Sequence, residues 1–146
     1  MILYTIGFTR KSAEQFFRLL QTNDVQCIVD IRLHPNSQLA GFTKKDDLQY
    51  FLAHLLNCDY KQMQVLAPTE ELLSEYRNDH DWERYASRFE TLMEERNVPD
   101  CLDKLFFMQK KCCLLCSEAQ PEKCHRRLVA ERLARSWREL EIVHLM

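Results

Sequence analysis

Residues 112–127 read CCLLCSEAQPEKCHRR, and the fold we expect for the chain follows from this stretch. The apolar run at 112–117 predicts a buried strand, and the arginine-rich segment at 124–140 predicts a helix. The polar loop between them and the residues at its two ends carry groups that can act as nucleophile, acid, base or anion ligand: Cys116, Glu118, Cys124, His125 and Arg126. A strand, a loop with reactive groups and a helix in this order indicate an α/β fold with a site at a strand end.

Strand-like and helical segments alternate along the rest of the chain. Four further strands are expected at residues 2–6, 27–31, 60–66 and 141–145. Apolar residues recur at helical spacing in most of the intervals between the strands. We therefore predict a single three-layer α/β/α domain over residues 1–146, Rossmann-like, with a mainly parallel five-stranded sheet in the order 3-2-1-4-5.

The composition is that of an ordinary globular protein. The 146 residues are 46% hydrophobic and 29% charged, and a formal net charge of −2 gives no overall attraction to nucleic acid or to a membrane. No stretch is apolar and long enough to span a bilayer. Seven cysteines without a secretion signal lead us to expect a cytoplasmic protein, with free thiols rather than a disulfide framework.

Polar residues follow three of the predicted strands. Gly7 and Thr9 come after the first strand, and Arg32, Pro35 and Ser37 come after the second. The loop at 117–124 follows the fourth. Because the carboxyl ends of parallel strands lie at one edge of a sheet, we expect these groups to meet as ligand contacts in one pocket, where the strand order reverses.

Arg126 lies in the middle of the apolar face of the last predicted helix, in its first turn. It has two interpretations. It can bind an anion together with Arg32 and the N–H groups of the helix N-terminus, or it can bridge Asp30 or Glu118 inside the protein. Asp30 stands in an apolar strand and must have a partner, and Arg32, two residues on, is the structural candidate.

Three residues are candidates for catalysis. Glu118 can act as a general acid or base, or it can form a salt bridge with an arginine. Cys124 at a helix N-terminus and Cys116 at a strand end can be nucleophiles, or they can be small thiols packed in the core. His125 can be a base or a ligand contact, or it can cap the loop through a backbone carbonyl.

The cysteines also have an interpretation as metal ligands. Cys113 and Cys116 have the spacing of half a zinc knuckle, but residues three apart on a strand point to opposite faces. Cys116, Cys124, His125 and His34 have the ligand types of a tetrahedral site. Since there is no second CxxC pair, and too few glycines for a nucleotide-binding loop, we expect no metal and no cofactor.

Several motifs together resemble a known family. They are Thr5-Ile6-Gly7, Val29-Asp30-Ile31-Arg32 with Pro35 and Ser37, Gly41-Phe42, and Leu115-Cys116-x-Glu118-x-x-Pro121-x-x-Cys124-His125-Arg126. In this order, and across essentially the whole chain, they resemble the domain-of-unknown-function family 488 (DUF488). The resemblance implies a compact, cytoplasmic, prokaryotic-type α/β domain in which these motifs cluster, and it implies no particular reaction. Many relatives carry histidine after Thr-Ile-Gly, where this chain has Phe8, so a mechanism with a base at that position is not expected.

The function we predict is that of a small enzyme acting on a phosphate-bearing ligand, a nucleotide or a nucleic-acid end, at the carboxyl edge of the sheet. Arginine and a helix N-terminus both suit phosphate. The alternative is a non-catalytic module that binds nucleic acid or a protein through the arginine-rich last helix, with no membrane partner. Residues 69–109 match no motif, and we expect them to form the substrate-specific side of the pocket.

Overall fold

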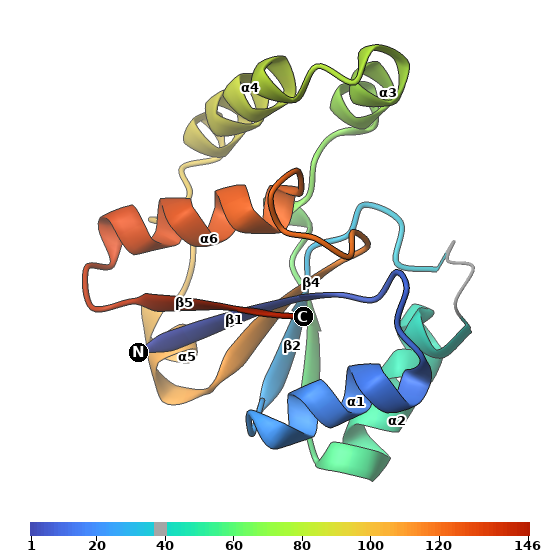
Figure 1. Ribbon diagram of the computed structural model, residues 1–146. Coiled ribbons are helices and arrows are strands. Elements are labelled where there is room, and N and C mark those ends of the chain that lie inside the picture. Colours follow the sequence, from blue (N-terminus) through green and yellow to red (C-terminus); the bar gives the residue numbers. More distant parts are fainter. Residues whose placement is uncertain (37–40) are drawn as a thin grey trace.

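The computed structural model describes residues 1–36 and 41–146 of the chain (Figure 1). The described residues form one five-stranded sheet in which every pairing is parallel. Its strands are β1 (Ile2–Gly7), β2 (Cys27–Asp30), β3 (Asp59–Gln62), β4 (Cys112–Cys116) and β5 (Glu141–Leu145). The predicted α/β architecture with a parallel sheet between helices is confirmed. No helix among these residues has the length and apolar character needed to cross a bilayer.

Helices cover both faces of the sheet. The short 3₁₀ turns η1 (Gly41–Thr43) and η2 (Gln64–Leu66) precede α2 and α3, and the α-helices are α1 (Ala13–Thr22), α2 (Lys45–Leu56), α3 (Glu70–Asp79), α4 (Trp82–Glu95), α5 (Lys104–Gln109) and α6 (His125–Ser136). Figure 1 shows α1 and α2 on one face and α6 on the other, with α3 and α4 lying beyond α6, away from the sheet. Residues 69–109 thus build α3, α4 and α5.

The two faces of the sheet bury two separate apolar clusters, as the alternation of side chains along a strand requires. On β4, Leu114 and Cys116 pack with α4 and α6, whereas Cys113 and Leu115 pack with α1 and α2. All five residues of β4 are buried, because this strand is central and covered on both sides. The edge strand β3 is partly exposed and shorter than predicted: it ends at Gln62 and continues as η2.

The strand order differs from the predicted one. The sheet runs β3-β2-β4-β1-β5. The strand next to β2 is therefore β4, whereas the predicted order 3-2-1-4-5 placed β1 next to β2. Both β1 and β4 are buried apolar strands, and their sequences therefore carry no signal for which of the two is the inner one. The connection after β1 crosses β4 on the α1 face, and the connection after β4 crosses β1 on the α6 face.

The two crossing connections pack against each other at the carboxyl edge. The backbone N–H and the hydroxyl of Thr9 both donate to the carbonyl of Ser117, at 3.1 and 2.6 Å. Gly7 lies directly beneath this crossing. A Cβ atom at Gly7 would overlap the carbonyl group of Glu118 and come within 2.8 Å of Nη1 of Arg126. Glycine is required here for space between two backbones.

We expect Gly7→Ala to lower the free energy of unfolding by about 1–3 kcal/mol, because the loop after β4 must shift to admit the methyl group. Gly41→Ala is the matched control, since nothing lies within 4 Å of a Cβ at Gly41. That control should stay within about 0.5 kcal/mol of the parent. Urea denaturation of the three proteins gives the comparison, and equal stability of the two variants would contradict the packing described.

Candidate functional site

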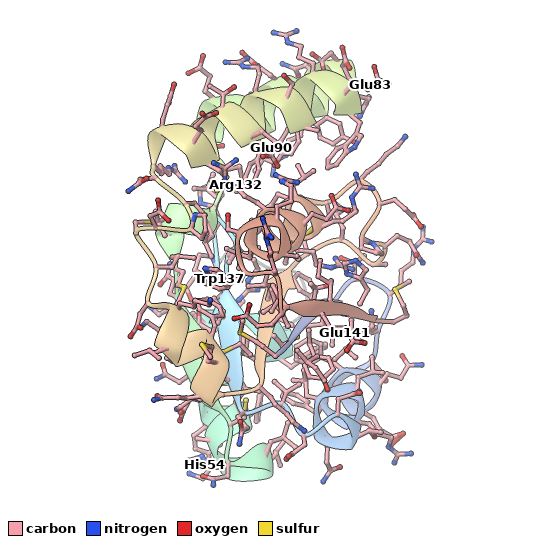
Figure 2. The ribbon with its side chains drawn as sticks, turned by 90° about the vertical axis from the view of Figure 1, so that its left-hand side faces the viewer. His54, Glu83, Glu90, Arg132, Trp137 and Glu141 are labelled. Carbon is pink, nitrogen blue, oxygen red and sulfur yellow. A yellow bond between two sulfur atoms is a disulfide. The ribbon has the colours of Figure 1, made fainter. Side chains whose placement is uncertain are left out.

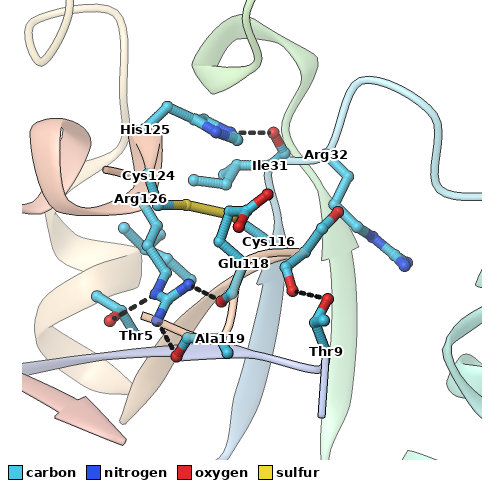
Figure 3. The surroundings of a disulfide bond; sticks show 12 residues. Thr5, Thr9, Ile31, Arg32, Cys116, Glu118, Ala119, Cys124, His125 and Arg126 are labelled. Carbon is cyan, nitrogen blue, oxygen red and sulfur yellow. Dashed lines mark hydrogen bonds between the residues drawn. A yellow bond between two sulfur atoms is a disulfide. The ribbon is translucent and has the colours of Figure 1, made fainter. Parts of the chain in front are cut away.

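The loops after β1, β2 and β4 meet at the carboxyl edge of the sheet, as the sequence predicts for parallel strands. Thr9 contacts Ser117, and the ring nitrogen Nε2 of His125 lies 2.8 Å from the carbonyl oxygen of Ile31. These contacts join the first loop to the third and the third to the second. Figure 3 shows the region around Cys116 and Cys124.

Arg126 is fully buried, and its donors are used by the protein itself. Its Nε faces the hydroxyl of Thr5 at 3.3 Å, Nη1 donates to the carbonyl of Glu118, and Nη2 donates to the carbonyl of Ala119 at 3.2 Å. Burial lowers the pKa of the guanidinium from its ordinary value. Arg126 points inward, as its helical position predicts. Its partners are backbone carbonyls rather than the expected carboxylates, which favours the structural interpretation over anion binding.

Arg32 forms a buried ion pair with Asp30. Its Nε lies 2.9 Å from Oδ1 and its Nη2 2.8 Å from Oδ2, and the hydroxyl of Tyr60 donates to Oδ2 at 2.5 Å. Burial, followed by the hydrogen bond to Asp30, raises the pKa of Tyr60. Nη1 of Arg32 is buried without a hydrogen-bond partner among the described groups, and the guanidinium lies 5.6 Å from the ring centre of Phe8. Figure 3 shows the side chains of Arg32 and Arg126 pointing in different directions, so the two do not form one clamp.

Cys116 and Cys124 are joined by a disulfide bond, which the expectation of free thiols did not include. Cys116 ends β4 and Cys124 is the N-cap residue of α6, so the intervening loop folds back and brings the two sulfur atoms together. Both residues are buried. A bonded sulfur is not a thiolate, and either cysteine must be reduced before it can act as a nucleophile. The free cysteines among the described residues are Cys27, Cys58, Cys101, Cys112 and Cys113.

His125 caps the loop after β2 through a backbone carbonyl, one of the two roles considered for it. Since a carbonyl only accepts, Nε2 of His125 carries the hydrogen in its contact with Ile31, and Nδ1 keeps a lone pair. Burial lowers the pKa of His125 to about 4, so the ring is neutral near neutral pH. His125 is therefore a neutral ring that donates a hydrogen bond to the carbonyl of Ile31, and it places no positive charge beside the disulfide.

The remaining predicted site residues have varied surroundings. The side chain of Glu118 is exposed, and only its backbone carbonyl is held by Arg126. Thr9 is exposed, Pro35 is buried with its carbonyl accepting from the N–H of Lys45 at 3.1 Å, and Ser37 lies outside the described residues. His34, a possible fourth metal ligand, faces Glu70 at 2.5 Å instead.

The arginines of α6 also have partners within the protein. Arg132 lies 2.9 Å and Arg135 3.0 Å from the same carboxylate oxygen of Glu90 on α4, and Arg132 also donates to the carbonyl of Val98 at 2.8 Å. Figure 2 labels Glu90 and Arg132 where α4 packs over α6. Arg127 lies 3.4 Å from Glu131. These arginines of α6 therefore each have an acidic partner within the protein.

A cavity of about 530 Å³ opens beside the crossing of the two connections. Its lining comes from the loop after β1, from α1, from the loop after β4 and from the last residue of the sequence: Thr9, Arg10, Lys11, Gln15, Arg18, Leu19, Thr22, Ala119, Gln120 and Met146. Burial, and then the charge of Arg126, lowers the pKa of Lys11. Of these residues, Thr9 was expected at the site from the sequence, whereas the three cations of the cavity were not. The adjacent pair Arg10-Lys11 after a strand end was the signal that could have indicated them.

The model of the family described as domain of unknown function DUF488 matches residues 12–133. The chain belongs to this family. The matched span runs from the N-cap of α1 into the last turns of α6, and it contains all the motifs quoted above except Thr5-Ile6-Gly7. No curated protein and no solved structure matches this DUF488 chain.

Replacing Arg126 by Met in this DUF488 protein keeps much of the apolar stem and removes the charge and the forked donors. We expect the free energy of unfolding to fall by about 2–4 kcal/mol, since two part-buried backbone carbonyls each lose a charged donor. Arg138→Met, at an exposed position, should change it by less than about 0.5 kcal/mol. Chemical denaturation measures both. Unchanged stability of Arg126→Met together with weaker anion binding would restore the ligand interpretation.

Proposed function

We propose that this DUF488 protein is a small enzyme that binds a phosphate-bearing ligand, a nucleotide or a nucleic-acid end, in the cavity between the loops after β1 and β4. The observation that supports this is the cavity lining, in which Arg10, Lys11 and Arg18 contribute three cations. No aspartate or glutamate is among the described residues that line it. The cavity volume, about 530 Å³, falls in the range of small-ligand sites.

The charges around the cavity favour an anion. Lys11 is half-buried and repelled by Arg126, so a phosphate group beside it would relieve the cost of holding its charge. Arg18 has a carboxylate nearby, that of Glu14 at 3.9 Å, but both side chains are largely exposed and the pair is weak. Arginine supplies a planar fork for phosphate oxygens and lysine supplies a point charge.

Arg126 takes an indirect part in this proposal. By holding the carbonyls of Glu118 and Ala119 it fixes the loop that carries Ala119 and Gln120 into the cavity wall. Glu118 is next to these lining residues in the chain and has an exposed carboxylate. We therefore retain it as the proposed general acid or base.

The first test of the proposal is ligand binding. Lys11→Met should weaken the affinity for inorganic phosphate or a nucleoside monophosphate by about 10- to 100-fold, the loss expected for a hydrogen bond between charged groups. Arg77→Met, at an exposed position on α3, removes one positive charge far from the cavity lining and should leave the affinity unchanged. Isothermal titration calorimetry measures both variants. Equal affinities of Lys11→Met and the parent protein would place the ligand elsewhere.

The second test separates an enzyme from a binding module. A panel of nucleotides and short oligonucleotides with 5′ or 3′ phosphates is incubated with the protein, and products are followed by phosphate release and mass spectrometry. For any substrate turned over, Glu118→Gln should lower kcat by about 100-fold or more while ligand affinity changes little. Glu122→Gln, an exposed carboxylate on the same loop, is the matched control and should retain kcat. Binding without turnover across the panel would favour the module.

A further inference from the structure

The sulfur atoms of Cys116 and Cys124 and a ring nitrogen of His125 all lie within 4.8 Å of one another. Among the described residues, this is the group of histidine, cysteine and carboxylate side chains close enough to share one ion. A tetrahedral zinc ion, with bonds of about 2.0–2.3 Å, holds its ligand atoms roughly 3.3–3.8 Å apart. Small side-chain movements are therefore enough to place one cation between the three atoms.

We propose that, in the reduced protein, Cys116, Cys124 and His125 bind a thiophilic divalent cation such as Zn²⁺. Two thiolates neutralise the charge of the ion, and thiolate and imidazole together suit zinc better than calcium or magnesium. The three side chains supply three ligands. The fourth tetrahedral position is then open to water or to a ligand group, as in zinc sites that act on substrates.

The surroundings of His125 fit this role. Nε2 donates to the carbonyl of Ile31, so the lone pair available to a cation is on Nδ1. Histidines that bind metals characteristically donate their other N–H to a carbonyl or carboxylate, which fixes the ring. Figure 3 shows the ring of His125 held against Ile31 on one side of Cys116 and Cys124. The second contact that a metal-binding histidine needs is therefore already present.

The backbone positions of the cysteines also fit. Their Cα atoms lie 7.7 Å apart, which is beyond the separation that most disulfides span, whereas an ion between two sulfurs allows a longer span. Cys116 is fixed by the sheet and Cys124 by the start of α6, and the sulfur of Cys124 makes no capping hydrogen bond to that helix. Its electrons are thus available to a cation once the disulfide is reduced.

The site keeps three of the four residues considered as tetrahedral ligands from the sequence, without His34, and its proposal replaces the expectation of no metal. Cys113 lies on the other face of β4, packed against α1 and α2, and takes no part in it. The disulfide and the ion use the same two sulfur atoms, so they exclude each other. The reduced protein should bind the cation, and the oxidised protein should not.

The test uses Co²⁺ as a spectroscopic probe for Zn²⁺. The full chain is reduced, freed of reductant without air, and titrated with Co²⁺ while its visible and near-ultraviolet spectrum is followed. We expect one equivalent to give tetrahedral d–d bands with thiolate-to-cobalt charge transfer, and Zn²⁺ to displace it. Cys116→Ser and Cys124→Ser should weaken binding by about 100-fold or more, and His125→Asn by about 10-fold or more. Cys101→Ser, at an exposed free cysteine, should bind as the parent does.

A second measurement needs no variant. Zn²⁺ should protect Cys116 and Cys124 of the reduced protein from iodoacetamide, as read by mass spectrometry of their peptides, and should leave labelling of Cys101 unchanged. Absence of the charge-transfer bands in the reduced protein, bands that persist in both serine variants, or zinc protection confined to the buried pair Cys27 and Cys112 would each overturn the proposal. The proposed phosphate binding uses the cavity lined by Arg10, Lys11 and Arg18, which we call the basic cavity. It does not depend on any of these outcomes, since none of the three metal ligands lines that cavity.

Discussion

The carboxyl edge of the sheet depends on one buried cation. The guanidinium of Arg126 is surrounded by the hydroxyl of Thr5 and the carbonyls of Glu118 and Ala119, with no carboxylate among the partners described. Backbone carbonyls are strong dipoles, and two of them together with a hydroxyl oxygen can stabilise a charge that is buried away from water. Because these acceptors belong to the loop after β4 and to β1, the same charge that they stabilise joins that loop to the sheet.

The strand order gives this cation its importance. In the predicted order, the connections after the first and fourth strands would lead to opposite sides of the sheet, and the loops would separate and leave a crevice. Here β4 is the inner strand, so the two connections cross and close that space, with Gly7 below the crossing and Arg126 beside it. The cavity lies to one side of the crossing, next to α1. The cations that line it are Arg10, Lys11 and Arg18, and not the motif residues Arg32 and Arg126.

Much of the architecture could be predicted because it follows from short-range patterns. Ser12 and Gln15 have the three-residue spacing of a capping box and form one at the start of α1, with contacts of 3.1 and 2.9 Å. Asp30 pairs with Arg32, as a charged residue within an apolar strand must. Arg126 points inward because helical periodicity places it on the apolar face. What could not be predicted is the conformation of the irregular loop between β4 and α6, which no periodic pattern encodes. Sequence patterns do not reveal which carbonyls converge on an arginine, or that a loop returns to bring Cys124 to Cys116.

The position of α4 has a consequence for how such a domain can diverge. Glu90 reaches across to Arg132 and Arg135, so α3 and α4 form an outer layer resting on α6 and add no residue to the lining of the basic cavity. Buried residues of both helices, Leu72 and Phe89 among them, belong to the same core cluster as β4, but the turn between the helices at 80–81 is exposed. We expect insertions at that turn to leave the sheet, the crossing and the cavity in place. The loop at 117–124 has no such freedom, because it is tied at Ser117, Glu118 and Ala119. We therefore expect changes of length to be tolerated at the turn between α3 and α4 and to be destabilising in the loop at 117–124.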